Sequence, residues 1–482
     1  MNYQKFLETK TQLVPDSGFP FEGDYGELFP FQRHILDLSC VRGRSAVFAD
    51  CGLGKTPIQL KWADAVVEHS GRPVLIFAPL AVAAQTEREG DKFGVEVTIC
   101  REQADTTSGV NIANYEMLSH FDPYKFSGIV LDESSILKNF GGKRRKEITA
   151  FAASIPYRLC CTATPAPNDQ LEVTNHSHFL GVMSTLETKG LFFIQDGNTT
   201  HKYKLKGHAE RDYWAWMSQW AVACRTPSDL GFENDGFILP ELNKTQHTVG
   251  GHVTDGWLFG VEAHTMSERR QARKESTDKR VAICADLVNT TTEPFLVWCD
   301  TNEESAKLTK AIPDAVEVAG ATQDDARVDR MMGFSEGRYR VIVTKPSIAG
   351  FGMNWQHCAN MAFVGLSDSF ERMYQAIRRC WRFGQTKPVD VHVICADTEG
   401  AVVANIERKE REAAHMMAEL VSHMHVEYKR QKDDDRYEGT QQATAPAWLN
   451  GGGNHDEENA ECEDAKELHS NETGNPRRVC AL

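Results

Sequence analysis

Residues 45–67, SAVFADCGLGKTPIQLKWADAVV, decide the fold of this 482-residue chain. An apolar run typical of a strand leads into a loop with two glycines, and the loop opens directly onto a stretch of helical character. A strand, a glycine-containing loop and a helix in this order are typical of a phosphate-binding loop. Ala49 stands where the general pattern has its first glycine. We therefore predict an α/β fold with this loop at the carboxyl edge of a parallel sheet.

The loop itself carries the predicted phosphate contacts. Gly52 and Gly54 allow backbone amides to approach a triphosphate without interference from a Cβ atom. Lys55 places a positive charge against the β and γ phosphates, and the Thr56 hydroxyl is placed to ligate Mg²⁺. Together with Leu53, which lies between the glycines, these residues form the expected cofactor-binding set of the loop, and Lys55 is also expected to act in catalysis.

Two acidic residues follow the apolar run Ile129–Leu131, about 75 positions after the loop. Because strands of an open parallel sheet present their carboxyl ends to the ligand, Asp132 and Glu133 are expected at the same edge as the loop. Asp132 would hold the metal, Mg²⁺, through water. Glu133 would orient and deprotonate the attacking water.

A pair of arginines lies more than 300 positions after the phosphate loop, within residues 375–385, QAIRRCWRFGQ. Arg379 and Arg382 are three residues apart on one expected helix face, and each could neutralise charge on a transferred phosphoryl group. An isolated pair of this kind is usually a solvated helix face. The Gln375 before it and the Gly384-Gln385 after it favour a catalytic pair, held on a second domain across a cleft that opens and closes.

Apolar runs alternate with helical stretches in two separate blocks, which indicates two parallel sheets wrapped by helices. We predict an α/β protein with two tandem RecA-like lobes and ATP in the cleft between them. The expected domains are a first lobe at 1–180, a helical insertion and linker at 181–275, a second lobe at 276–430 and an acidic, disordered tail at 431–482.

The middle stretch contains four tryptophans among basic residues, and two interpretations stay open. Tyr213, Trp216, Met217 and Trp220 fall at helical spacing and would form a core stripe, which is the favoured interpretation. Alternatively, aromatic and basic residues together can make a stacking platform for single strands, with 202–206 as the better candidates for phosphate contact.

Composition sets further limits. The net charge is −15, and the tail from Gln431 supplies twelve acidic against five basic residues, or −7, so a nucleic-acid track must be a local basic groove on an acidic body. No apolar run approaches the roughly 20 residues that span a bilayer. The 13 cysteines are scattered and include no CxxC pair, which favours reduced thiols in an intracellular protein over a zinc or disulfide framework. His176 and His178 lack partners at metal-ligand spacing.

The motifs resemble those of superfamily-two helicase-like ATPases, and specifically the Swi/Snf-like branch of DNA translocases. The resemblance runs across about residues 28–400. Gln32 in LFPFQRHIL resembles the glutamine that reads adenine, and Ser134 and Ser135 replace the Ala-His of motif II. The remaining segments are ADCGLGKT (motif I), residues 76–89 (Ia), 113–118 (Ib), 131–139 (II), CTATPAPND at 161–169 (III), 344–356 (V, with Gly352 and Asn354 in register) and 375–385 (VI).

The resemblance implies a nucleic-acid motor that couples Mg-ATP hydrolysis to translocation on duplex DNA, with ATP and Mg²⁺ as cofactors and DNA as partner. Single-stranded DNA and RNA stay open as partners, and a strand-separating helicase is the first alternative. The second alternative is a nucleotide-gated DNA-binding clamp with weak hydrolysis, because of the serines in motif II. No membrane partner is expected. The compact length favours a protein of the cytoplasm of a prokaryotic or virus-infected cell.

Overall fold

The computed structural model describes most of the chain. Residues 1–431 form one compact unit, and residues 432–482 form a second. The described residues are 16–79, 82–138, 141–195, 203–234, 236–250, 276–349, 353–367, 369–396 and 400–434. The predicted tail therefore lies almost entirely outside the described residues.

The first sheet has seven strands in the order β3-β4-β2-β5-β6-β1-β9, and every neighbouring pair is parallel. Its central strands are buried along their length, which explains the near-continuous apolar runs in the sequence. The strands are β1 (Arg44–Ala49), β2 (Val74–Ala78), β3 (Val97–Ile99), β4 (Val110–Asn114), β5 (Gly128–Asp132), β6 (Tyr157–Cys161) and β9 (Ala221–Cys224).

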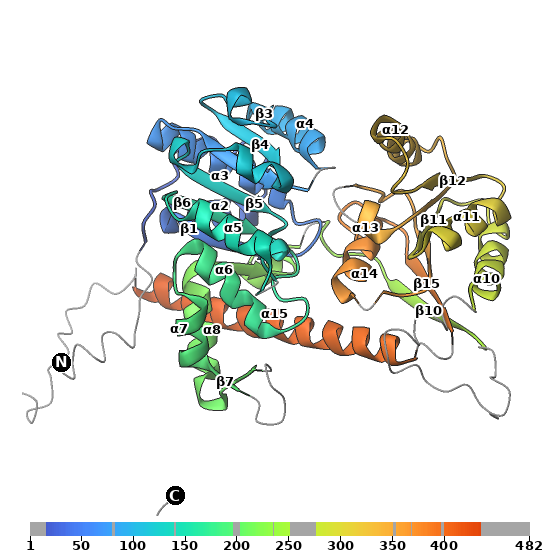
Figure 1. The fold of residues 1–482 in the computed structure, drawn as a ribbon. Coiled ribbons are helices and arrows are strands. Elements are labelled where there is room, and N and C mark those ends of the chain that lie inside the picture. The colour runs from blue at the N-terminus through green and yellow to red at the C-terminus, as the bar shows by residue number, and fades with distance from the viewer. Residues whose placement is uncertain are drawn as a thin grey trace, which may run out of the picture. The chain divides into compact units, whose positions relative to one another are not determined.

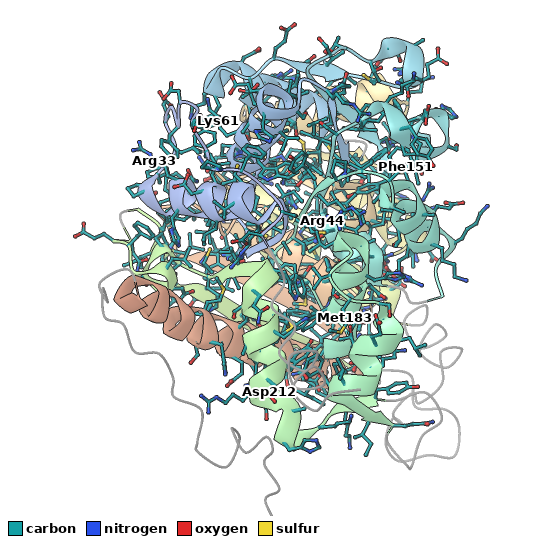
Figure 2. The ribbon with its side chains drawn as sticks, turned by 90° about the vertical axis from the view of Figure 1, so that its left-hand side faces the viewer. Arg33, Arg44, Lys61, Phe151, Met183 and Asp212 are labelled. Carbon is teal, nitrogen blue, oxygen red and sulfur yellow. The ribbon has the colours of Figure 1, made fainter. Side chains whose placement is uncertain are left out.

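Helices follow the strands of this sheet and cover its faces (Figure 1). Phe151 of α5, labelled in Figure 2, packs edge to face against Phe77 of β2, with ring centroids 5.8 Å apart. The helices are α2 (Pro30–Arg42), α3 (Lys55–Ser70), α4 (Ala83–Phe93), α5 (Lys143–Ala152), α6 (Val173–Leu180), α7 (Thr185–Phe192) and α8 (Glu210–Trp220).

The second sheet has six parallel strands in the order β10-β15-β14-β11-β13-β12. Together the two helix-flanked parallel sheets confirm the predicted α/β fold with two RecA-like lobes. The strands are β10 (Leu242–Val249), β11 (Phe295–Cys299), β12 (Ala315–Val318), β13 (Val341–Thr344), β14 (Asn360–Val364) and β15 (Val389–Ala396). The helices are α10 (Thr277–Asn289), α11 (Asn302–Ala311), α12 (Asp324–Ser335), α13 (Pro346–Ala349) and α14 (Phe370–Ile377).

The described residues of the stretch 181–275, the predicted helical insertion and linker, include strands as well as helices. They contribute β9 to the first sheet and β10 to the second, and β7 (Phe193–Gln195) and β8 (Tyr203–Leu205) form an antiparallel pair. β9 has only four residues and follows α8 without a turn signal, so sequence periodicity cannot separate it from the helix. β10 is a mostly polar strand at the edge of its sheet, so it has no apolar run from which to predict it.

The aromatic stripe of α8 belongs to the core, as favoured by its spacing. Tyr213, Met217 and Trp220 are fully buried, and Trp216 is 5% exposed. Lys206 donates to the carbonyls of Gly190 and Leu191 and so caps α7, while Lys202 lies outside the described residues. The stacking-platform interpretation is therefore wrong for this stripe.

The long helix α15 (Gly400–Asp434) contacts the cores of both lobes. Val402 and Ile406 pack into the core of the second sheet. About three to five turns further on, its apolar residues pack into the core of the first sheet, namely Met416, Met417, Leu420 and Met424. In the part of the chain that the structure describes, no helix is long and apolar enough to cross a bilayer. The eleven described cysteines are all free thiols, and ten of them are buried.

Candidate nucleotide-binding and catalytic site

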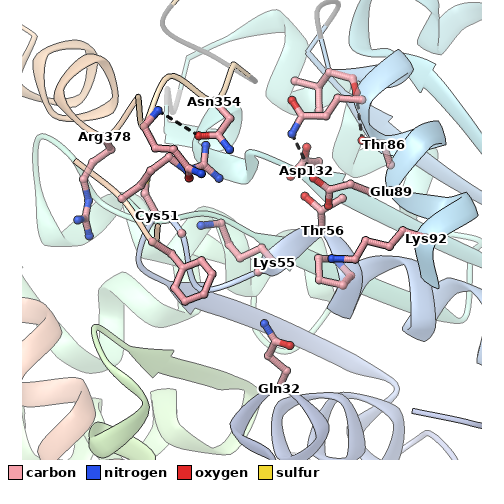
Figure 3. A pocket seen from close by; sticks show the side chains of 18 of the residues that line it. Gln32, Cys51, Lys55, Thr56, Thr86, Glu89, Lys92, Asp132, Asn354 and Arg378 are labelled. Atoms are coloured by element: carbon pink, nitrogen blue, oxygen red, sulfur yellow. Dashed lines mark hydrogen bonds between the residues drawn. The ribbon is translucent and has the colours of Figure 1, made fainter. Parts of the chain in front are cut away.

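One cavity of about 560 Å³ is lined by residues from both lobes (Figure 3). Its volume is within the range of small-molecule sites. Figure 3 shows Lys55 between Arg378 on one side and Lys92 on the other. Most of the predicted site residues line it, namely Gln32, Gly52, Gly54, Lys55, Thr56, Asp132, Glu133, Asn354, Arg379 and Arg382. Gly352 lies outside the described residues.

The phosphate loop requires glycine at both predicted positions. Gly52 and Gly54 have φ values of 88° and 73°, in the left-handed region that favours glycine. A Cβ atom on Gly54 would lie 2.2 Å from Gln32 Nε2, and one on Gly52 would lie 2.9 Å from the backbone nitrogen of Phe383. Lys55 Nζ donates to the carbonyls of Ala49 and Asp50, over 2.9 and 3.2 Å. The Lys55 ammonium has three donors, so one N–H remains for a phosphate oxygen.

Gln32 ties the first helix to the phosphate loop. Its Oε1 accepts from the Phe29 amide over 2.9 Å, and its Nε2 donates to the Leu53 carbonyl over 3.0 Å. A second proton and a second lone pair remain on the Gln32 amide for a base. The Leu53 side chain points into the core and is 4% exposed. The Leu53 side chain does not line the cavity, and the place of Leu53 in the nucleotide-binding loop stays a prediction.

Asp132 ends β5 and is held from two sides. Gln59 of α3 donates to its Oδ1 over 2.9 Å, and the Tyr115 hydroxyl donates to its backbone carbonyl over 2.7 Å. Burial raises the pKa of Asp132, against the hydrogen bond from Gln59, which lowers it. Gln59 was missed from the sequence, although it lies three residues after Thr56 and thus on the same face of α3.

Glu133 has a φ of 63°, and among the described residues it is the only non-glycine residue with a positive φ. Backbone in this region costs about 1–3 kcal/mol and is often found at active sites. The Thr162 hydroxyl, from motif III, donates to Glu133 Oε1 over 2.5 Å and accepts from the Thr164 amide over 3.0 Å. Burial raises the pKa of Glu133, and the hydrogen bond from Thr162 opposes that effect.

The two serines of motif II are buried, at 0% and 3% exposure for Ser134 and Ser135. Ser134 Oγ lies 3.1 Å from His176 Nε2 of α6. His176 is fully buried, its ring stands edge to face against Phe48, and burial lowers its pKa to about 4. No group of three metal-ligating side chains occurs among the described residues. His176 thus contacts motif II through Ser134.

The two predicted arginines have different surroundings. Arg379 Nε donates to the Gln375 carbonyl and its Nη1 to the Met353 carbonyl, each over 3.2 Å, and burial lowers its pKa to about 10. Arg382 is half-buried, and its Nε is buried without a hydrogen-bond partner among the described residues. A Cβ on Gly52 would lie 3.5 Å from Arg382 Cβ, so Arg382 stands beside the phosphate loop. The neighbouring Arg378 also lines the cavity and was missed, because adjacent arginines give no signal of their own.

The donor set suits Mg²⁺. Thr56 offers a hydroxyl, and Asp132 and Glu133 offer carboxylates in the same cavity. These are hard oxygen ligands, which Mg²⁺ prefers, and it usually keeps several waters alongside one or two carboxylates. Asp132 Oδ1 accepts from Gln59, which leaves Oδ2 for a metal-bound water.

Comparisons with known proteins agree with this geometry. The helicase conserved C-terminal domain matches residues 278–384. Protein p41 of Acyrthosiphon pisum secondary endosymbiont phage 1 is 23% identical over 467 residues, covering 81% of this chain and 98% of that protein. The SWI/SNF-related matrix-associated actin-dependent regulator of chromatin subfamily A-like protein 1 of Xenopus laevis is 28% identical over 159 residues, covering 31% of this chain and 16% of that protein.

Among solved structures, the SWI2/SNF2 ATPase core of Sulfolobus solfataricus in complex with double-stranded DNA has a TM-score of 0.40. It is 19% identical and covers 77% of this chain and 88% of its own. The helicase-domain match and the sequence relatives, together with the motif residues that line one cavity, support the resemblance of this chain to superfamily-two helicase-like ATPases of the Swi/Snf-like branch.

Proposed function

We propose that the chain is an ATP-driven motor that uses Mg-ATP hydrolysis to move along duplex DNA. One observation carries the proposal: the phosphate loop of the first lobe and the arginines of the second line the same cavity. A nucleotide bound there would touch both lobes. Its binding and hydrolysis would therefore close and open the cleft, which is the motion that a stepping motor needs.

The proposed hydrolysis assigns each residue a separate task. The backbone amides at Gly52 and Gly54 and the Lys55 ammonium hold the phosphates. Glu133 takes a proton from the attacking water and orients it in line with the γ phosphate. Arg382 neutralises the charge that develops on the transferred group. Arg379, bound to the backbone of motif V at Met353, would instead link the phosphate end of the cavity to the second lobe.

Mg²⁺ would be held by Thr56 and, through water, by Asp132, and it supplies neutralisation of the phosphate charge when bound. Gln59 keeps the Asp132 carboxylate turned toward the cavity. The Tyr115 hydroxyl fixes the backbone at the end of β5 by its bond to the Asp132 carbonyl. Because these two contacts already fix the Asp132 carboxylate, less conformational entropy would be lost when the metal binds.

DNA is the proposed track because of the motif resemblance and the Xenopus relative, whose name describes a regulator of chromatin. The aligned region is a small part of that relative, so its activity is carried over here only as a proposal. Duplex DNA is favoured over single strands on the Swi/Snf-like character of motifs I and VI. The phage relative favours action in the cytoplasm of a prokaryotic or virus-infected cell.

The test is steady-state ATP hydrolysis with no polymer, duplex DNA, single-stranded DNA or RNA, each at two salt concentrations. Because phosphate contacts release counterions, stimulation should weaken at the higher salt. Lys55→Ala gives the background rate. Greatest stimulation by duplex DNA is expected. Greater stimulation by single strands or RNA would favour a helicase, and ATP-dependent DNA binding without turnover would favour a clamp.

A further inference from the structure

Helix α14 carries two stripes of side chains at helical spacing. Glu371, Tyr374 and Arg378 lie at positions i, i+3 and i+7, and therefore share one face of the helix and its C-cap. The other stripe is apolar and packs with the core of the second sheet, through Phe370, Met373, Ala376 and Ile377. The helix is thus anchored in the second lobe and presents a polar face elsewhere.

The polar face contacts the first lobe at two points. At the start of α14, Glu371 forms an ion pair with Lys138, five residues after Glu133. The Glu371 side chain is 4% exposed. At its end, the Arg378 guanidinium and the Tyr374 hydroxyl both donate to the carboxylate of Asp50.

Asp50 joins β1 to the phosphate loop, and its carboxylate also accepts from the Cys51 amide over 2.6 Å. The side chains of Arg378 and Asp50 are 4% and 16% exposed. The Trp381 ring lies 4.7 Å from the Arg378 guanidinium and restricts its orientation. Buried charges of this kind are costly when either partner is lost, so both contacts favour one position of α14 against the first lobe.

We infer that α14 is a two-point clamp, in which Glu371–Lys138 and Arg378–Asp50 hold the second lobe in the position where Arg382 reaches the phosphate loop. The inference rests on the proposed function, because it assigns Arg382 a role in hydrolysis. The clamp residues are positioning residues that act through Arg382.

The short connection between clamp and arginine supports this role. Arg382 follows Arg378 by four residues. At this point the two lobes are in tight contact, since a Cβ on Gly52 would lie 2.9 Å from the Phe383 amide nitrogen. A shift of α14 by even one ångström would therefore carry Arg382 away from the loop, and misplacement on this scale can cost about 100-fold in rate.

A charge swap provides the test. Lys138→Glu and Glu371→Lys each place like charges together, and the double variant restores an ion pair in reverse. We expect each single variant to lower kcat at saturating ATP by about tenfold or more, because close charge pairs across interfaces couple strongly. The double variant should recover to within about threefold of the parent, with little change in ATP affinity throughout. Lys387→Glu breaks an exposed ion pair with Glu293 inside the second lobe and should change nothing.

Lobe separation is a second readout that does not depend on hydrolysis. Small-angle scattering should give a larger radius of gyration for each single variant and the parental value for the double variant. Tyr374→Phe removes only the hydroxyl that donates a hydrogen bond to Asp50, and it replaces the charge-reversal variants if one of them does not fold. It should lower kcat and leave ATP affinity unchanged.

The outcomes separate the two proposals. Absence of ATP turnover by the parent with every polymer would overturn the proposed function, while the scattering comparison would still decide the clamp. Turnover by the parent with single variants that match it in kcat and radius of gyration would overturn the clamp alone. A double variant no better than the singles would do the same.

Discussion

Gly54→Ala tests the geometry of the phosphate loop most sharply. Gly54 has φ of 73°, and a Cβ there would lie 2.2 Å from Gln32 Nε2 and 3.4 Å from Pro57 Cγ. A left-handed backbone costs an L-residue about 1–2 kcal/mol. Forcing extra atoms into a packed site typically costs about 1–3 kcal/mol more. Gly54→Ala should therefore lower the free energy of unfolding by about 2–5 kcal/mol.

Gly71→Ala is the matched control. Gly71 has φ of 67° at the end of α3, and nothing lies within 4 Å of a Cβ built on it. This variant should lose only the backbone term of about 1–2 kcal/mol. The difference between the two variants isolates the close approach of Gln32 to the loop. The Gly54→Ala/Gln32→Ser double variant should regain part of the unfolding free energy that Gly54→Ala loses beyond Gly71→Ala, because the shorter side chain makes room for the new Cβ.

The assay is denaturant unfolding followed by far-ultraviolet circular dichroism, with ATP affinity measured in parallel. Gly54→Ala should also weaken ATP binding, since the loop amides are displaced, whereas Gly71→Ala should keep it. Equal loss of stability in the two glycine variants, with ATP binding unchanged in both, would refute the described packing of Gln32 on the loop.

Four further variants test other parts of the account. Lys55→Ala should abolish ATP hydrolysis with the fold kept, and normal turnover would contradict the site. Arg382→Ala should lower kcat by about 1,000-fold or more with ATP affinity nearly unchanged. The control is Arg372→Ala, which changes an exposed arginine of α14 and should alter neither quantity. Equal losses of kcat and ATP affinity would argue that Arg382 does not stabilise the transition state. The pKa of His176 is lowered to about 4, so the native state loses stability as pH falls from about 6.5 toward 4, by roughly 3 kcal/mol in total. His176→Gln should flatten that part of the curve of unfolding free energy against pH. An unchanged curve would contradict the burial of a neutral His176. Leu420→Ala should cost about 2–5 kcal/mol of stability if α15 packs into the first core, and an unchanged melting temperature would argue that it does not.

Much of the fold was readable from the sequence because its strands are buried on both faces. In the sequence, residues 74–78 and 157–161 are apolar runs flanked by helical stretches or turns, and these runs form β2 and β6. β4 escaped because Asn111, a buried polar residue, interrupts its apolar pattern. Its amide nitrogen donates to the nearby carbonyls of Thr107 and Gly109 and to the Val74 carbonyl of β2, and such bonding cannot be read from periodicity.

The site was predicted where chemistry and spacing agree, as in the loop at Gly52–Thr56 and the acids at Asp132 and Glu133. The sequence could not indicate that Asp50 would meet Arg378, because the two lie 328 positions apart and only the folded lobes bring them together. Nor could it distinguish Arg379 from Arg382. Their difference arises from the Met353 carbonyl, a backbone group that has no sequence signature.

The same limit applies to α15. The pattern Met416, Met417, Leu420 and Met424 predicts an apolar face, but not which core that face meets. Long-range packing of this kind depends on where the preceding strand, β15, leaves the second sheet.

The central claim is that ATP hydrolysis drives movement along duplex DNA, and a triplex-displacement assay tests it most directly. A labelled third strand is bound to one end of a duplex, and its release is followed with ATP, without ATP, and with Lys55→Ala. The account predicts ATP-dependent release of the third strand, with the two duplex strands still paired and no release by Lys55→Ala. ATP hydrolysis without release, or separation of the duplex strands themselves, would contradict it.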